Sequence, residues 1–238
     1  MVSRVLKNSI FLRIYAGLVV LVVVVAVFCY LLVQIINYQR AQEYRESLTD
    51  GISYVISEGV ARQPEKQQKL DWISDASNLL ELPIYYVDAA RVELSRTERK
   101  RIAEQKSVVR YDANNGIGYV IIGLKDDPKH FLYIKVDKIG ERQMKALPIF
   151  VLDYLIFYPG QEREYLEKIK KHFYYPIEIA DIRDINLDSE QIGRLRQGQS
   201  VLLYKDSASI RGTTISIVSP MPNHPAQVLV LGPVPMFN

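Results

Sequence analysis

Residues 83–111 read PIYYVDAARVELSRTERKRIAEQKSVVRY, and residues 176–204 read PIEIADIRDINLDSEQIGRLRQGQSVLLY. The two stretches align without a gap at an offset of 93 residues. The alignment contains eight identical pairs: Pro83/Pro176, Ile84/Ile177, Asp88/Asp181, Leu94/Leu187, Arg101/Arg194, Ser107/Ser200, Val108/Val201 and Tyr111/Tyr204. Fixed-offset similarity of this kind indicates an internal duplication.

The same order of elements is predicted around both stretches. In the first copy, helices over 38–62 and 67–81 precede a strand over 84–93, a helix over 96–105, and strands over 107–112, 118–124 and 131–137. The second copy repeats this with helices over 141–158 and 161–174, a strand over 177–185, a helix over 188–197, and strands over 200–205, 213–219 and 227–232. Short turns make the last three strands antiparallel, and we expect the helices to be gathered on one side of each sheet.

The fold class that follows is α+β, with two tandem PAS-like α-α-β-α-β-β-β units built on antiparallel sheets. The comparison with PAS-like extracytoplasmic sensor modules is one of fold alone. We expect the first unit to span residues 37–140 and the second to span residues 141–238.

An uncharged apolar stretch, IYAGLVVLVVVVAVFCYLLVQII, runs from Ile14 to Ile36. As a helix it is long enough to cross a hydrocarbon core of about 30 Å. A cleaved signal peptide would have a shorter apolar core, of about 7–15 residues, and small residues at its end. We therefore expect a retained transmembrane helix.

The charges beside this stretch predict its orientation. Arg4, Lys7 and Arg13 precede it without any acid, whereas the arginines that follow it are offset by Glu43 and Glu46. The positive-inside rule places residues 1–13 in the cytoplasm. The rest of the chain then lies across the membrane, which in a bacterium means an inner-membrane protein whose bulk is periplasmic.

The exported part carries 27 lysines and arginines and all 27 acids, so its formal charge is balanced and predicts no nucleic-acid partner. The only cysteine of the sequence, Cys29, lies inside the apolar stretch. The exported part therefore has no thiol for disulfides or for binding a metal. No catalytic motif with the spacing of a metalloprotease, phosphate loop or nucleophile elbow is present. We expect neither catalytic nor cofactor-binding nor metal-binding residues in this chain.

The helix over 38–62 has an apolar stripe that includes Leu48, Ile52 and Val55. Two interpretations stay open. In one, the stripe only covers the local sheet; in the other, it also pairs with the same helix of a second subunit. Gly51 and Gly59 lower helix propensity but permit close approach of a neighbour.

Charged runs flank the duplicated strands. Asp181 and Asp184 begin an acidic run in which Asp188 or Ser189 is expected to cap a helix; a divalent-cation site is the less favoured alternative. A basic run in the first copy is interpreted as a solvated helix face, or alternatively as a contact for anionic lipid: Arg96, Arg99, Lys100 and Arg101.

His130 and His224 hold nearly the same place in the two copies, just before the last strand. An unperturbed histidine titrates near pH 6.5 and can report acidification. Simple solvent exposure is the favoured explanation. Together with Asp181 and Asp184, these histidines are the candidate sensing residues.

A family resemblance rests on RLRQGQSVLLYKD at 194–206, VLVLGPVP at 228–235 and the ending GPVPMFN. With its anchor and duplicated exported part, the whole chain resembles the N-terminal part of two-component sensor histidine kinases of the BfmS/RstB type. The resemblance implies a homodimeric inner-membrane receptor that autophosphorylates on histidine and passes the phosphate to a cytoplasmic response regulator. It also implies a second membrane span, expected after Asn238.

The kinase motifs themselves, with their ATP and Mg²⁺ sites, match no position here, so no catalytic residue is carried over. The expected function is extracytoplasmic sensing of a periplasmic protein or small ligand. The alternative is a membrane-anchored periplasmic scaffold or accessory binding protein without signalling output.

Overall fold

The computed structural model describes residues 10–112, 115–137, 140–207 and 212–235, so Arg4, Lys7 and the final residues of GPVPMFN lie outside the description. The chain divides into two compact units, Met1–Tyr44 and Arg45–Asn238. One long helix, α2 (Ile10–Ala61), includes residues of both units.

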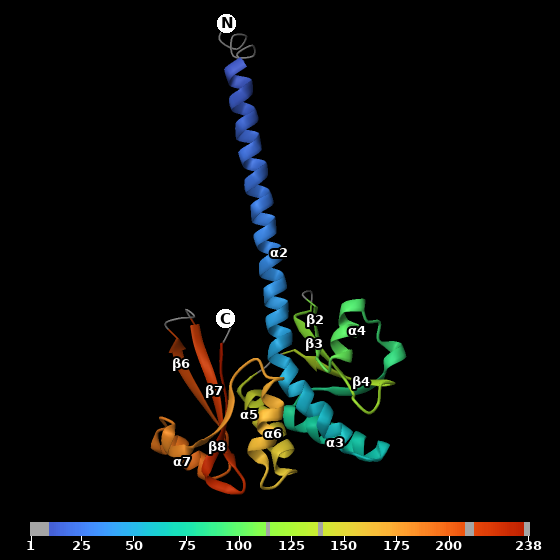
Figure 1. Cartoon of the computed structure of the whole chain (residues 1–238), viewed down its shortest axis with the longest axis vertical. Helices are drawn as coiled ribbons and strands as arrows, with labels where there is room; N and C mark the ends of the chain where they lie inside the picture. Colours follow the sequence, from blue (N-terminus) through green and yellow to red (C-terminus); the bar gives the residue numbers. More distant parts are fainter. Residues whose placement is uncertain (1–9, 113–114, 138–139, 208–211, 236–238) are drawn as a thin grey trace. The chain divides into compact units, whose positions relative to one another are not determined.

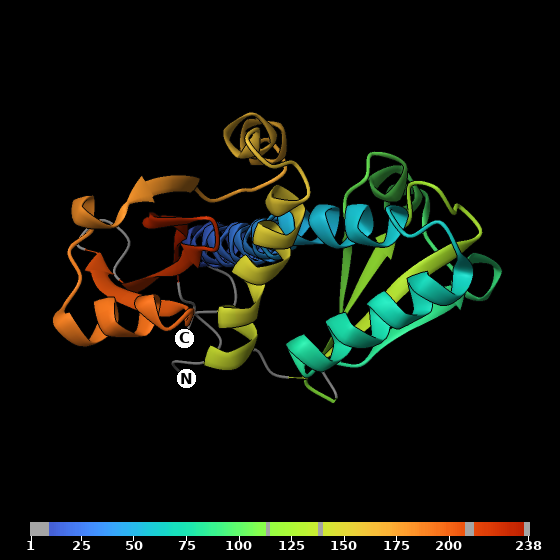
Figure 2. The same ribbon diagram turned by 90° about the horizontal axis from the view of Figure 1, so that it is seen from below.

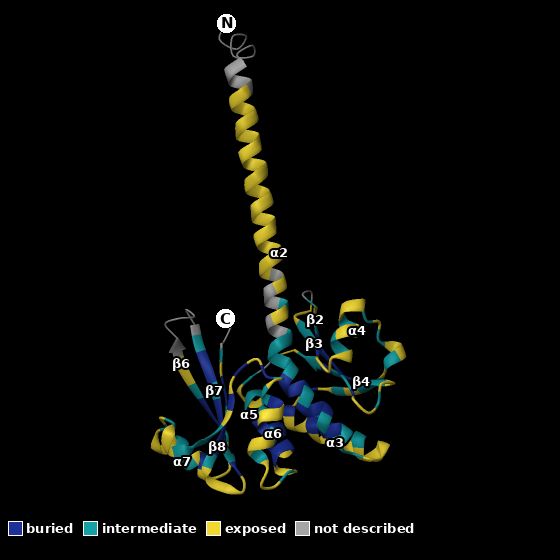
Figure 3. Ribbon diagram, in the orientation of Figure 1, coloured by how far each residue is buried: buried dark blue, intermediate teal, exposed yellow. Residues whose placement is uncertain are grey.

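The described part of the first unit is helical, and most of it is apolar. Its stretch Ile14–Asn37 has a mean hydropathy of 3.1, and none of it is buried within the protein. Figure 3 shows this segment as a continuous exposed stretch. This stretch is long and apolar enough to cross a membrane. A membrane anchor and a signal sequence share both properties.

The second unit has two halves, which we name the N-half (residues 45–137) and the C-half (residues 140–235). After α2, the N-half contains α3 (Lys66–Leu80), β1 (Ile84–Asp88), the 3-10 turn η1 (Ala89–Arg91), α4 (Arg96–Ala103), β2 (Val108–Asp112), β3 (Ile117–Gly123) and β4 (His130–Val136). Its strands form one antiparallel sheet in the order β1-β4-β3-β2 (Figure 1).

The C-half contains α5 (Glu141–Ile156), α6 (Glu162–Lys170), β5 (Ile177–Asp181), the 3-10 turn η2 (Ile182–Asp184), α7 (Ser189–Arg196), β6 (Val201–Ser207), β7 (Gly212–Met221) and β8 (His224–Pro235). Its antiparallel sheet has the order β5-β8-β7-β6, the same as in the N-half. The first strand, the 3-10 turn and the start of the strand after the short helix recur at an offset of 93. The α+β architecture with two four-stranded antiparallel sheets is thus confirmed.

Both first strands are shorter than predicted. Asp88 ends β1 by accepting a hydrogen bond from the Ala90 amide at 2.8 Å, and Asp181 ends β5 by accepting one from the Arg183 amide at 2.9 Å. A side chain that bonds the backbone two residues on competes with the strand ladder. The residues predicted as strand beyond each aspartate therefore begin with a 3-10 turn.

The short helices begin as their sequences indicate. Ser95 and Glu98 form a reciprocal capping box at α4. Asp188 caps α7 in the same way with Gln191, which confirms the expected cap. Each box satisfies amides that a helix start leaves unpaired.

The main core draws on both halves. Five of its nearly inaccessible side chains come from five different elements: Ile56 of α2, Leu132 of β4, Leu155 of α5, Ile169 of α6 and Leu229 of β8. Arg62, just after α2, adds a link by placing its guanidinium 4.4 Å from the ring centre of Tyr154 in α5. Figure 2 shows the whole ribbon from below.

Smaller clusters lie on the opposite faces of the two sheets. In β3, Ile122 belongs to the main core, whereas its neighbour Ile121 packs with Ile102 of α4. In the C-half, Leu195 of α7 packs against Val218 of β7 in the same way. The expectation that helices gather on one side of each sheet is therefore wrong. Strands that are apolar on both faces require cover on both.

Two glycines of α2 allow close contacts inside the chain. A Cβ at Gly51 would lie 2.5 Å from the Phe173 ring, and a Cβ at Gly59 would lie 2.4 Å from the Trp72 ring. Gly51 and Phe173 belong to different halves. The glycines thus bring α2 close to aromatic rings of its own chain.

Candidate functional site

A cavity of about 410 Å³ separates the two sheets within the second unit. We call it the inter-sheet cavity. Its walls come from α2, the end of α3, both sheets and α5, and the main lining side chains are apolar: Leu48, Ile52, Ile56, Leu80, Leu82, Val120, Ile122, Ile134, Val136, Met144, Leu147, Ile215, Ile217 and Val234.

The local sequence explains this lining. Leu48, Ile52 and Ile56 are four residues apart, so they occupy one face of α2. On the strands, Val120 and Ile122 alternate with residues that face the other side of the sheet. The apolar stripe of the helix and the inner faces of both sheets therefore meet at the cavity.

Two of the polar side chains at the cavity, Thr49 and Gln143, are bonded within the protein. The Thr49 hydroxyl donates to the carbonyl of Glu46 at 2.9 Å, and the Gln143 amide oxygen accepts from Gly140 at 2.9 Å. Burial raises the pKa of Tyr175, which keeps this phenol protonated. The arrangement suits binding of an apolar group rather than acid–base chemistry.

The predicted dimer residues lie at or near this cavity. Leu48 is half-buried and lines it with Ile52, whereas Val55 is 2% exposed and belongs to the main core. The helix therefore covers the local sheet, as one of the two interpretations requires. Pairing with a second subunit stays a prediction, and charged substitutions at Val55 would test stability rather than dimerisation.

His130 lies at the start of β4. Its ring stacks on Tyr86 with centroids 4.3 Å apart, and its Nδ1 is 3.0 Å from both carboxylate oxygens of Asp127. Asp127 also accepts a hydrogen bond from the Tyr86 hydroxyl. Burial and that hydrogen bond raise the pKa of Tyr86 to about 12, while the bonds from Tyr86 and His130 outweigh burial and lower the pKa of Asp127.

His224 has a different environment. It begins β8, its side chain is 46% exposed, and its Nε2 is 3.9 Å from Glu162. In the sheet register His130 faces Asp88, but the residue that faces Asp181 is Gln227. Both histidines thus begin the last strand of their half, but they are not equivalent in register. The cause is the β6–β7 hairpin, which is longer than the β2–β3 hairpin. Their sensing role stays untested.

The third histidine is closer to the junction of the halves. His172 stacks on Tyr54 of α2 with ring centroids 3.7 Å apart. Burial, and then the charge of Lys171, lower the pKa of His172.

The acidic run has structural partners. Asp181 caps η2 and pairs with Arg183 at 2.8 Å, and these hydrogen bonds lower the pKa of Asp181 to about 2. Asp184 is exposed in η2. Among the described residues, no three histidine, cysteine or acidic side chains are grouped to hold a metal ion.

One member of the basic run faces inward. Arg101 pairs with Asp50 at 3.1 Å and with Glu46 at 3.2 Å, so it ties α4 to α2. The buried Ser107 completes this network through Asp50. Sequence reasoning missed it, although the identical pairs Arg101/Arg194 and Ser107/Ser200 were a visible signal.

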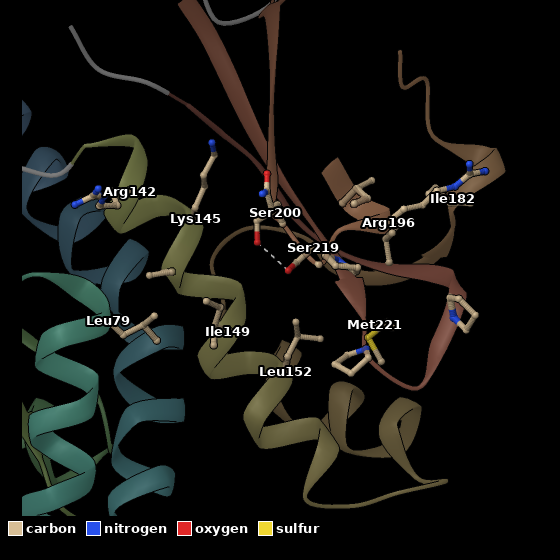
Figure 4. Close-up of a pocket in the computed structure, with 18 residues that line it drawn as sticks. Leu79, Arg142, Lys145, Ile149, Leu152, Ile182, Arg196, Ser200, Ser219 and Met221 are labelled. Atoms are coloured by element: carbon tan, nitrogen blue, oxygen red, sulfur yellow. Dashed lines mark hydrogen bonds between the residues drawn. The ribbon is translucent and has the colours of Figure 1, made fainter. Parts of the chain in front are cut away.

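A second hollow, of about 640 Å³, lies in the C-half beside α5, and we call it the C-half hollow. Figure 4 shows Arg142 and Lys145 on α5, with Ser200 and Ser219 on the sheet side joined by a hydrogen bond of 2.9 Å. Its floor is apolar and includes Leu152 and Met221. Unlike the inter-sheet cavity, it combines apolar surface with cations.

No family model matches the chain, and no curated protein matches it.

Proposed function

We propose that the chain is the extracytoplasmic sensing part of a membrane-bound sensor histidine kinase. It would act as a homodimer in a bacterial inner membrane and control phosphotransfer to a cytoplasmic response regulator. Catalysis, with its ATP and Mg²⁺, would belong to a kinase core outside this chain. The two halves would be PAS-like copies that arose by duplication.

The observation that carries the proposal is the inter-sheet cavity. Both sheets and α2 contribute to its walls, and α2 also contains the apolar stretch Ile14–Asn37. A periplasmic ligand or partner that changes the filling of this cavity would alter the spacing of the two sheets. Because packed cores favour discrete arrangements, such a change would switch the halves between two states.

The stimulus must supply enough binding free energy to shift the receptor between its two states. Moving a two-state receptor from mostly off to mostly on requires about 5.5 kcal/mol of differential binding. Burial of apolar surface contributes about 25 cal/mol per Å², so complete burial of a mid-sized apolar group supplies a large part of that energy.

Dimerisation is testable on the exposed side of α2. Gln39 and Glu43 are exposed, and single cysteines there, in a Cys29→Ser background, should crosslink across a homodimer in membranes. Crosslinking no greater than that of a cysteine at the exposed Lys129 would reject the α2 dimer.

The test of sensing is a disulfide between the halves. The near contact between Gly51 and the Phe173 ring places these two positions within reach of a disulfide. A Gly51→Cys/Phe173→Cys double variant in the Cys29→Ser background should fix the halves against each other. We expect oxidation to freeze response-regulator phosphorylation in cells, and reductant to restore its response to the stimulus.

Each single-cysteine variant controls for loss of the glycine or the ring. A fully oxidised double variant that still responds normally would overturn movement between the halves. Deletion of this chain is the test of the alternative. If response-regulator phosphorylation is unchanged without it, the chain is instead a periplasmic scaffold.

A further inference from the structure

The first helices of the two halves correspond at an offset of 95. Apart from the half-buried Leu147, every buried position between Gly51 and Val60 of α2 has a buried counterpart in α5, from Ala146 to Leu155. Asp50 therefore corresponds to Lys145, and Glu46 to Glu141. The first strands and the short helices correspond at 93 instead, because the whole segment from the end of α5 to β5 is two residues shorter than the segment from the end of α2 to β1.

In the N-half this position holds a carboxylate. Asp50 accepts hydrogen bonds from the Ser107 amide at 2.9 Å and from the Ser107 hydroxyl at 2.8 Å. Arg101 donates to both oxygens of Asp50 at 3.1 Å. The Asp50 and Arg101 side chains are only 14% and 20% exposed.

In the C-half the donors persist and the carboxylate does not. Arg194 and Ser200 replace Arg101 and Ser107 at an offset of 93, but Lys145 takes the place of Asp50. Arg194 pairs instead with Glu190 at 3.1 Å, and the Ser200 hydroxyl bonds to Ser219. Among the described residues, no carboxylate pairs with Ser200.

The C-half hollow lies at this place. Three cations, Arg142, Lys145 and Arg196, line it together with Ser200, and no acid is among its lining residues. Arg142 pairs with Glu81 and Lys145 with Glu141 at 2.5 Å. Arg196 takes part in none of the ion pairs between described residues. An anion at Ser200 would have Lys145 of α5 on one side and Arg196 on the other, with apolar surface such as Leu152 nearby (Figure 4).

We propose that the C-half hollow binds an organic carboxylate. Its carboxylate group takes the position at Ser200 and Lys145 that the Asp50 side chain takes in the N-half. Its apolar body lies over the floor formed by residues such as Leu152, Ile182 and Met221. The internal counterpart favours a carboxylate over a phosphate, because the group that fills the N-half position is itself a carboxylate. The inference adds a ligand class to the proposed sensor but does not require signalling.

The test is a titration of phenylacetate into the full chain held in nanodiscs, followed by calorimetry. We expect saturable binding, and much weaker binding of the neutral phenylacetamide because it lacks the charge that the cations recognise. Lys145→Asp supplies an internal carboxylate and should abolish binding. Arg196→Gln should weaken binding about tenfold or more.

Lys129→Asp is the matched control, since it makes the same charge change at an exposed residue outside the hollow. It should bind phenylacetate as the parent chain does, and thermal melting checks that each variant folds. Absence of saturable binding, equal binding by Lys145→Asp, or binding of inorganic phosphate in place of phenylacetate would overturn the inference. None of these results bears on the disulfide test, so the two proposals fail separately.

Discussion

The N-half and the C-half have the same sheet order but differ in their charges. In the N-half, Asp50 closes the junction between α2 and the end of α4 through Arg101 and Ser107. In the C-half the corresponding residue is Lys145, and the junction borders a hollow of about 640 Å³. One charge reversal at a shared position thus separates a closed junction from one suited to a ligand. The backbone scaffold alone does not determine which of the two results.

The largest expected effect comes from removing the carboxylate of the closed junction. Asp50→Ala leaves Arg101 half-buried without its main partner and the Ser107 amide unbonded. We expect a loss of about 3 kcal/mol in unfolding free energy, as for other partly buried pairs that lose one member. Lys145→Ala, at the matching position of the C-half, should change stability by less than about 1 kcal/mol. Equal losses in urea unfolding would remove the distinction between the halves.

The next prediction concerns the close packing of α2 against the Trp72 ring. Gly59→Ala pushes a methyl group into the Trp72 ring. Overpacking of this kind costs about 1–3 kcal/mol, more than the helix propensity gained. Gly193→Ala is the control in the C-half, because a Cβ there meets nothing within 4 Å. It should stabilise the protein by up to about 1 kcal/mol. A higher melting temperature for Gly59→Ala than for Gly193→Ala would contradict this packing.

A smaller effect concerns an ion pair that only the N-half has. Glu98 accepts from Arg110 at 2.8 Å, whereas the corresponding C-half residues are Gln191 and Leu203. The hydrogen bond from Arg110 outweighs burial and lowers the pKa of Glu98 to about 2. Because the folded-state pKa is depressed, this contribution is present above pH 4.5 and is lost as the pH falls from 4.5 towards 2.

Glu98→Gln makes this position resemble the C-half. We expect it to cost about 1 kcal/mol at pH 7, a figure reduced for the solvent exposure of Arg110. The variant should also lose less stability than the parent chain between pH 4.5 and pH 2. A parallel pH dependence of the two unfolding free energies would mean that Glu98 contributes no ionic stabilisation.

The sequence predicted the elements where local signals are strong. The capping pairs Ser95/Glu98 and Asp188/Gln191 mark the short helices, and the fixed offset of 93 predicts two similar sheets. The 3-10 turns were missed because aspartate side chains end the strands early. These bonds depend on local geometry that periodicity does not report.

The site was less predictable than the fold. The Asp50–Arg101 pair joins residues 51 positions apart, and its helices correspond at 95 rather than 93, so a gap-free alignment does not pair Asp50 with Lys145. The apolar stripe of α2 was visible, but not that Ile52 and Val55 would be buried within the same chain. Tertiary packing decided both points.

The most direct test of the account is amide hydrogen exchange at Ser107 and Ser200. In the parent chain, the Ser107 amide donates to Asp50 and should be protected, whereas the Ser200 amide, which has no such carboxylate, should exchange faster. In the Lys145→Asp variant, the introduced carboxylate should accept from Ser200, slow its exchange and leave Ser107 unchanged. Equal protection of both amides in the parent chain, or no slowing at Ser200 in the variant, would contradict the claim that the halves share one junction and differ by its carboxylate.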